Sequence, residues 1–234
     1  MIVNTEFGFP IVIYQDGVEL PKSGVYFVVA GNGLFMHKET GICSVFTPVK
    51  DLPILKDLNQ GVKLGLNIPK IPSRAIVNIK EFFKRILEKY NSESELSLMF
   101  NKDTSEYKIY APKQTVSYGS VNYDNSSLLF KEEFSGFIKV GTIHAHSDFD
   151  AFHSGTDIHD EENKDGFHIT FGHNDKDEFS ITSSVVVNGL RSKVDPENLM
   201  KGICHIKDDI YSIESDESIS EDLINNWVSN VSRF

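Results

Sequence analysis

The stretch HAHSDFDAFHSGTD, residues 144–157, decides how this 234-residue sequence is interpreted. Two histidines separated by one residue, His144 and His146, project to the same side of an extended strand, because strand side chains alternate with a period of two. They can therefore bind one metal ion together. Asp157 follows the second histidine by eleven residues and can return through the small-residue turn at Ser154 to supply an oxygen ligand.

Two histidines and one carboxylate, with a fourth position open, form the ligand set of a catalytic zinc rather than a structural one. We therefore expect one Zn²⁺ per chain, bound by His144, His146 and Asp157. A Cys-rich structural site is excluded, because the chain contains only two cysteines, Cys43 and Cys204. Both are expected to be small buried side chains rather than a disulfide, which fits a reducing compartment.

The composition excludes several classes of function. The formal net charge of −11 and the pI of about 5.2 oppose binding to phosphate backbones, so nucleic acid is not an expected partner. No apolar run approaches the roughly 18 residues of a membrane-spanning helix. The first residues lack the basic and apolar segments of a signal peptide. We expect a cytosolic protein that binds neither nucleic acid nor membrane.

Turn signals and hydrophobic patterning divide the chain into three parts. Residues 1–70 are predicted to be mainly β, with strand-like runs on both sides of the turn at residues 31–33 and prolines towards the end. Residues 71–205 are predicted to form the main α/β domain. Residues 206–234 are predicted to be an acidic loop followed by an amphipathic helix that docks on the body of the protein.

Local patterns predict individual elements of the main domain. Apolar residues at helical spacing predict a helix over residues 74–90, capped by Ser73. A strand is expected to open at Glu95, a second to cover residues 115–123, and a buried strand to lead into the metal motif from residue 137. In the C-terminal part, Ser218 and Glu221 form a predicted capping box.

The metal motif carries a family resemblance. His144, His146, Ser154 and Asp157 fit H-x-H-x7-S-x2-D, which resembles the signature of the JAMM/MPN metalloproteases. The resemblance implies an α/β fold in which a mixed, curved sheet is flanked by helices. It also implies a zinc-dependent hydrolase that cleaves peptide or isopeptide bonds. In this family a helix precedes a glutamate that opens a strand, and Glu95 occupies the corresponding place.

The resemblance also implies a role for each residue. Bound zinc lowers the pKa of a water molecule towards about 7, and a carboxylate raised in pKa by burial then transfers the proton to the leaving nitrogen. This role falls to Glu95, and stabilisation of the oxyanion falls to the hydroxyl of Ser154. Glu93 is an alternative base, because it lies two residues earlier on the same face of an extended chain. Both glutamates could also be ordinary surface charges.

Flanking segments resemble a subfamily, the JAB-like proteins of bacterial PRTRC systems. The similar segments are residues 31–35, 111–114 and 151–161. In those systems the JAB-like protein accompanies a ubiquitin-like β-grasp protein. The resemblance therefore implies a protein substrate of the ubiquitin-like class, cleaved next to its C-terminus, as by a deubiquitinase. The sequence leaves the identity of that substrate and the oligomeric state open.

Two other classes of function remain open on the sequence. A PHP-type phosphoesterase also uses the pattern His-x-His-Ser, but it needs several further metal-binding clusters downstream. A non-catalytic JAMM-like scaffold is the other, although scaffolds usually lose ligands and this chain keeps all three. The number of complete metal clusters separates these classes. Four further histidines have no motif partner and are expected to be structural more often than functional: His153, His159, His168 and His173.

Overall fold

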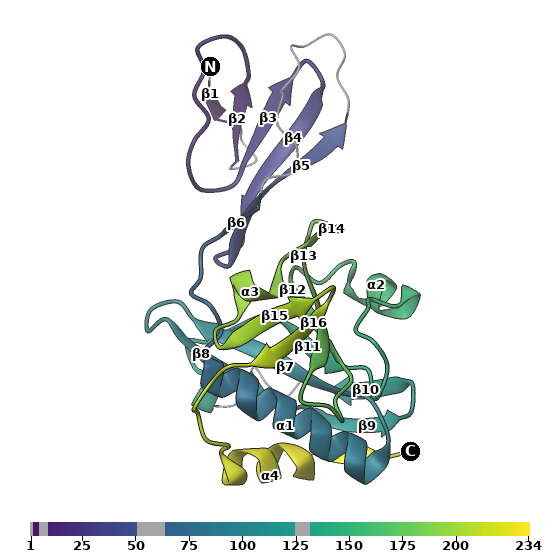
Figure 1. Ribbon diagram of the computed structural model, residues 1–234. Coiled ribbons are helices and arrows are strands. Elements are labelled where there is room, and N and C mark those ends of the chain that lie inside the picture. Colours follow the sequence, from purple (N-terminus) through teal and green to yellow (C-terminus); the bar gives the residue numbers. More distant parts are fainter. Residues whose placement is uncertain (1, 5–8, 51–63, 125–131) are drawn as a thin grey trace. The chain divides into compact units, whose positions relative to one another are not determined.

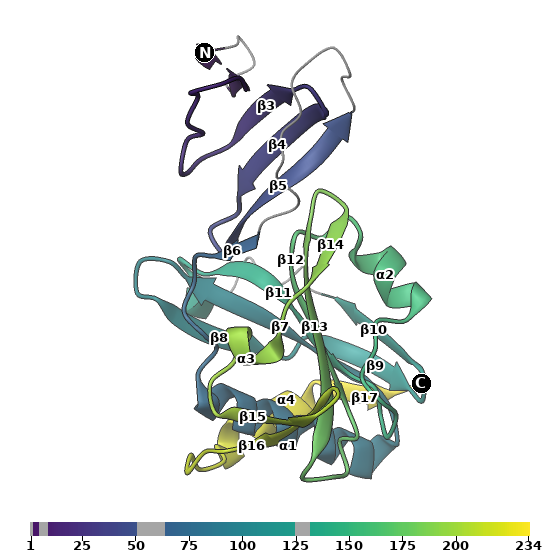
Figure 2. The same cartoon turned by 45° about the horizontal axis from the view of Figure 1, so that its top comes forward.

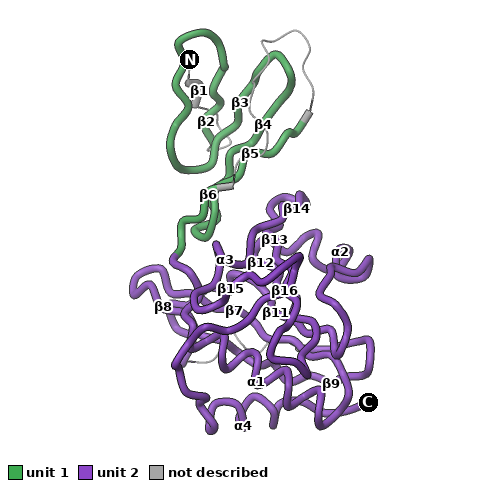
Figure 3. The backbone as a smooth tube through the Cα atoms, viewed as in Figure 1, with its two compact units in different colours: residues 1–68 green, residues 69–234 purple. Residues whose placement is uncertain are grey.

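The computed structural model describes residues 2–4, 9–50, 64–124 and 132–234. The chain divides into two compact units, residues 1–68 and residues 69–234 (Figure 3). The division lies close to the boundary expected near residue 70. Residues 206–234 belong to the second unit, so they are an integral part of it rather than an appended segment. The predicted β-rich part includes residues 51–63, which lie outside the described residues.

Unit 1 is a six-stranded sheet in which the strands follow one another in chain order. Its strands are β1 (Ile2–Asn4), β2 (Pro10–Ile13), β3 (Tyr26–Ala30), β4 (Gly33–Glu39), β5 (Cys43–Lys50) and β6 (Leu64–Leu66). β2 and β3 pair in parallel and the other neighbours are antiparallel. Alternate residues of β3 are buried, and Tyr26 and Val28 form a core with Val12 of β2. The predicted β character of this region is confirmed for the described residues.

Unit 2 has a mixed α/β architecture built on a curled eight-stranded sheet (Figure 1). The strand order is β15-β16-β13-β12-β11-β7-β8, with β14 paired to β13. The strands are β7 (Ser94–Asn101), β8 (Glu106–Tyr110), β11 (Ile138–Ala145), β12 (Gly166–Gly172), β13 (Phe179–Val187), β14 (Leu190–Lys193), β15 (Ile203–Lys207) and β16 (Ile210–Ile213). β11 and β12 run parallel, which makes the sheet mixed. The expectation of an α/β fold with a mixed curved sheet is therefore met at this level.

A second, three-stranded sheet has the order β10-β9-β17. It contains the hairpin of β9 (Lys113–Ser117) and β10 (Ser120–Asp124), which corrects the single strand predicted over residues 115–123. Tyr118 and Gly119 form a turn between the two strands. The pattern of side chains does not reveal this turn, so the sequence predicted one continuous strand. β17 (Val231–Arg233) pairs with β9 in parallel and forms one edge of this sheet.

Helix α1 (Ser73–Tyr90) confirms the predicted long helix but not its predicted cap. Pro72 is the N-cap residue, and no side chain caps the helix. The reason is tertiary: Ile71 is fixed by backbone hydrogen bonds to residues 199 and 201, so the helix begins immediately after Pro72. The helix ends at Asn91, which adopts a left-handed conformation with φ of 47°.

Helix α4 (Glu221–Ser229) confirms that the C-terminal segment docks on the body, and corrects its details. Ser220 is the N-cap, without a side-chain cap, so the predicted capping box at Ser218 does not form. The backbone N–H of Ser220 instead donates to Asn78 of α1. Trp227 packs edge-on against Phe82 of α1, with ring centroids 5.8 Å apart.

The eight-stranded sheet has two chemically different faces. Cross-strand neighbours share a face, so the register assigns each residue to one side. One face carries large apolar residues and packs against α1, where Phe83 contacts Phe171 at 5.6 Å between ring centroids. The other face is largely polar, and the short helix α2 (Gly155–Glu161) lies on that side (Figures 1 and 2). The predicted metal motif lies on the polar face.

Cys43 and Cys204 lie in different units and form no disulfide; Cys43 is buried as expected, whereas Cys204 is partly exposed. None of the described helices is both long enough and apolar enough to span a bilayer.

Candidate metal centre

The two histidines of the motif lie at the end of β11, an interior strand of the eight-stranded sheet. His144 is within the strand, which ends at Ala145, and His146 is the next residue. The backbone N–H of His146 donates a 2.7 Å hydrogen bond to the carbonyl of Phe171. This bond continues the pairing with β12 beyond the strand end. The two imidazoles therefore project from the same face, and both are buried. The predicted alternation is confirmed.

The third candidate ligand comes from helix α2. Ser154 is its N-cap, and Ser154 and Asp157 form a capping box. The backbone N–H of Asp157 donates to Ser154 Oγ at 3.2 Å, and the backbone N–H of Ser154 donates to Asp157 Oδ2 at 2.8 Å. The spacing Ser-x-x-Asp is thus explained locally: the serine starts the helix, and the cap fixes the carboxylate within its first turn.

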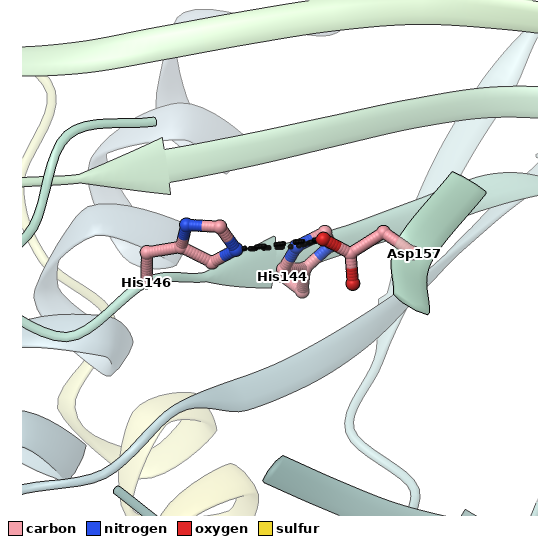
Figure 4. Close-up of side chains that lie close together, drawn as sticks. All are labelled: His144, His146 and Asp157. Atoms are coloured by element: carbon pink, nitrogen blue, oxygen red, sulfur yellow. Dashed lines mark hydrogen bonds and ion pairs between the residues drawn. The ribbon is translucent and has the colours of Figure 1, made fainter. Parts of the chain in front are cut away.

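The three side chains converge on one point (Figure 4). The Nε2 atoms of His144 and His146 are 3.3 Å apart, and each lies 3.6 Å from Asp157 Oδ2. Within the described residues, this is the one group of three or more His, Cys, Asp or Glu side chains whose ligand atoms meet closely enough for a metal ion. The structure thus brings together all three predicted ligands.

The distances fit the geometry of zinc. Zinc binds nitrogen and oxygen ligands at about 2.0–2.1 Å, and ligand atoms at the corners of a tetrahedron of that radius lie about 3.3–3.4 Å apart. The observed separations of 3.3, 3.6 and 3.6 Å are close to that edge length. The donor set of two imidazole nitrogens and one carboxylate oxygen also suits zinc. These residues therefore fit the ion that the sequence predicts.

Mutual attraction controls the charge states of two of the ligands. Burial alone would raise the pKa of Asp157, but hydrogen bonds with His144 and His146 outweigh it, and the pKa is lowered. Burial alone would lower the pKa of His144, but the Asp157 carboxylate reverses that effect and the pKa is raised. The Asp157 carboxylate is therefore ionised at neutral pH, which is the form that binds a metal ion.

Glu95 lies beside the ligands on the neighbouring strand. It is the cross-strand partner of His144 in the pairing of β7 with β11. The side chain is only 8% exposed, and among the described residues none provides a hydrogen-bond partner for its Oε1 atom. Burial raises the pKa of Glu95 to about 7, and the charges of Lys139 and His144 act in the opposite direction. A carboxyl group with this pKa can accept and release a proton near neutral pH.

Glu93 also faces the candidate metal centre. The register that pairs His144 with Glu95 places Glu93 opposite His146, just before β7 begins. Burial raises the pKa of Glu93, and the charges of His146 and His144 act against this rise. Its electrostatic neighbours are thus the ligands themselves, whereas Glu95 also interacts with Lys139 and with the hydroxyl of Tyr123. Both predicted candidates for the base lie at the site.

The ligands and both glutamates line one cavity of about 390 Å³. Ser154 also lines it. Its oxygen accepts the Asp157 N–H, and its hydroxyl proton remains able to donate into the cavity. At the opening, Phe149 and Phe152 are about half exposed, and Phe152 packs edge-on against the His146 ring at 4.6 Å between centroids. The cavity therefore combines a candidate metal centre, two acidic groups and exposed aromatic side chains.

The four histidines outside the motif have different environments. Nδ1 of His168 lies 3.3 Å from Oε1 of Glu161, and Nε2 of His173 lies 2.7 Å from Oδ1 of Asp150. His153 is held near Thr170, and burial lowers its pKa to about 4, so its ring is neutral at pH 7. For His159 the structure shows exposure on α2. His144, His146 and Asp157 are the ligand group, and none of these four histidines joins it.

The sequence interpretation missed residues that support the site. Gln114 exchanges two 2.8 Å hydrogen bonds with the backbone of Glu95 and so fixes the start of β7. Thr170 places its hydroxyl 3.3 Å from Nε2 of His144. Glu161, one helical turn after Asp157, is buried. Of these three residues, only Glu161 could have been found from the sequence. It is four residues after Asp157, and residues four apart share a helix face.

The chain was compared with protein-family models and with curated proteins, and neither comparison gave a match.

Proposed function

We propose that this protein is a zinc-dependent metallopeptidase of the JAMM type that hydrolyses a peptide or isopeptide bond. The observation that carries the proposal is the convergence of His144, His146 and Asp157 at distances suited to tetrahedral zinc, beside a buried carboxyl group with a pKa of about 7. A ligand set with an open position and a general base are the two elements that metal-assisted hydrolysis requires.

In this proposal the side chains divide the work. Zinc, when bound, polarises the substrate carbonyl and makes a water molecule acidic enough to lose a proton near neutral pH. Glu95 accepts that proton and delivers it to the leaving nitrogen, which its buried position and raised pKa favour. Ser154 donates its hydroxyl proton to the developing oxyanion. Phe149 and Phe152 add apolar surface to the cavity lining, against which apolar parts of a substrate can pack.

The proposed substrate class is a ubiquitin-like β-grasp protein, cleaved next to its C-terminus. This part rests on the resemblance of the H-x-H-x7-S-x2-D motif and of the flanking segments to the JAB-like proteins of PRTRC systems. The acidic surface, with a net charge of −11, is compatible with a protein substrate that carries basic segments. A cytosolic location belongs to the same proposal.

The phosphoesterase alternative needs several metal clusters, and the described residues bring together one. A scaffold that has lost catalysis has no need of a buried carboxyl group beside an intact ligand set, because burial of that group opposes folding. The described site therefore favours a peptidase over a phosphoesterase or a scaffold.

The first test is the zinc content of the purified protein, measured by elemental analysis. We expect about one zinc per chain, and loss of that zinc in His144→Ala. Two or three zinc ions per chain would favour the phosphoesterase. Absence of zinc after zinc is supplied would contradict the catalytic proposal.

A second test separates the two glutamates. The substrate is a ubiquitin-like protein fused through its C-terminus to a fluorescent reporter. Glu95→Gln should retain zinc and lose at least about a hundredfold in kcat, because general acid–base catalysis contributes about 10²–10⁴-fold. Glu93→Gln, the matched control two residues away, should lose much less. The reverse result would transfer the role to Glu93, and full activity in both variants would exclude a carboxylate base from this pair.

A further inference from the structure

Helix α2 carries a metal ligand, yet it lacks the apolar packing that normally fixes a helix. It has seven residues, and Glu161 is its buried residue. Its one large apolar side chain, Ile158, is 48% exposed. Helices this short are unstable alone and depend on tertiary contacts. Since α2 lies over the polar face of the sheet, those contacts have to be polar.

Glu161 supplies such contacts from the last turn of α2. Its Oε2 atom accepts a 2.6 Å bond from Arg191 of β14, and its Oε1 atom lies 3.3 Å from Nδ1 of His168 on β12. Both partners are themselves held in place: Arg191 donates to Ser184 of β13, and His168 contacts Thr142 of β11 at 2.9 Å. One carboxylate thus joins α2 to four strands of the sheet.

The charge state of Glu161 agrees with this arrangement. Burial would raise the pKa of Glu161, but hydrogen bonding and charge from His168, together with the bond from Arg191, outweigh burial and lower the pKa. The carboxylate is therefore ionised at neutral pH and fully paired. Removing one partner of such a buried pair leaves the other charge uncompensated, which is strongly unfavourable.

Asp157 and Glu161 are four residues apart, so they lie on the same face of α2, one turn from each other. The capping box fixes Asp157 relative to the helix, and Glu161 fixes the helix relative to the sheet that carries the histidines. We propose that Glu161, clamped by Arg191 and His168, is a positioning residue that holds Asp157 at the metal centre. This inference rests on the zinc site of the proposed function.

The test is zinc affinity, measured by competition with a chromophoric chelator, in variants of the full-length protein. Glu161→Gln and Arg191→Met should each bind zinc at least about tenfold more weakly, the usual effect of losing a residue that orients a ligand. Glu162→Gln is the matched control: it removes the same charge from the adjacent exposed position and should leave affinity within about twofold. Arg191→Lys should fall between Arg191→Met and the wild type.

Two further readouts separate positioning from general destabilisation. In the cobalt-substituted protein, Glu161→Gln should change the visible absorption that reports metal geometry, even at saturating cobalt. The double variant Glu161→Gln with Arg191→Met should lose no more zinc affinity than the more affected single variant, because both substitutions break one unit. Circular dichroism and thermal unfolding of the metal-free variants show whether the sheet is intact.

The outcomes distinguish the two proposals. If the wild type binds zinc and Glu161→Gln binds it equally well with an unchanged cobalt spectrum, the positioning role is wrong and the zinc site stands. Additive losses of zinc affinity in the double variant would also contradict the role, because they would show that Glu161 and Arg191 act independently. If the variants lose affinity as expected but the wild type cleaves no substrate, the positioning role stands and the peptidase proposal fails. A wild type that takes up no zinc overturns both.

Discussion

The two faces of the eight-stranded sheet are stabilised by different interactions. The face beneath α1 is apolar, with residues from four strands buried together: Leu96, Leu98, Ile143, Phe167, Ile169, Phe171, Ile181 and Val185. The opposite face alternates with it residue by residue and is lined by polar side chains: Glu95, Ser97, Thr142, His144, His168, Thr170 and Ser184. The same strands thus build a core on one side and, on the other, a polar surface that carries the candidate metal centre.

The apolar face stabilises this unit, whereas the polar face carries the candidate metal centre. The apolar face gains stability from apolar area removed from water, an effect that has no preferred direction. The polar face depends on directional contacts that fix side-chain positions, as in the contacts of Glu161 with Arg191 and His168. Substitutions on the two faces should therefore have different consequences: loss of folding on one, and loss of metal geometry on the other.

The largest effect is expected on the apolar face. Phe83 is 1% exposed and packs on Phe171, so Phe83→Ala leaves a cavity and should cost about 3–5 kcal/mol of unfolding free energy. Urea unfolding measures this loss. Lys84→Ala, an exposed neighbour on the same helix, is the control and should change the free energy by less than about 0.5 kcal/mol. A loss below about 1 kcal/mol for Phe83→Ala would show that α1 contributes little to the core.

The features that the sequence predicted correctly are those that depend on local patterns. The helix over residues 74–90 and the strand leading to His144 were predictable, because apolar side chains repeat with the local period. The three ligands were predictable because they lie within fourteen residues of one another. The local pattern therefore identifies the candidate ligands, although contacts with distant residues such as Phe171 and Arg191 fix their geometry.

The remainder depends on contacts between distant segments. The clamp on Glu161 comes from Arg191, thirty residues later, and no local pattern relates the two. The predicted cap at Ser73 is wrong because the pairing of Ile71 with residues 199 and 201 makes Pro72 the N-cap residue of α1. The capping box at Ser218 failed because Asn78 holds Ser220 instead. In each case a long-range hydrogen bond outweighed a short-range preference.

A smaller effect is expected from the buried charge on the apolar side. Lys80 of α1 donates a 2.8 Å hydrogen bond to the carbonyl of Asn174 and lies over the Phe179 ring. Burial lowers the pKa of Lys80 to about 8, below its unfolded value of about 10.4. Between these values the unfolded chain binds more protons, so this residue makes stability rise with pH from about 8 to 10.

Lys80→Met removes the charge and keeps the chain length. At pH 7 it should raise the unfolding free energy by about 1–2 kcal/mol, after the lost hydrogen bond offsets part of the gain. The difference between wild type and variant should shrink as pH rises from about 8 to 10. Parallel urea titrations at several pH values measure it, with Lys89→Met, at an exposed lysine of the same helix, as the control. A pH-independent difference would show that the lysine charge is not the cause.

The smallest effect on stability is expected at the N-terminus of α2. Ser154→Ala removes the cap of a helix that buries little surface, so only about 1 kcal/mol of local stability should be lost, visible as faster hydrogen exchange of the α2 amides. Ser154→Gly is the informative companion, because glycine costs only a few tenths of a kcal/mol as a cap yet also lacks the hydroxyl. If Ser154 stabilises the oxyanion, both variants should lose hydrolysis alike although only the alanine variant loosens α2. Hydrolysis that instead follows α2 stability, with the glycine variant nearly as active as the wild type, would limit Ser154 to holding Asp157.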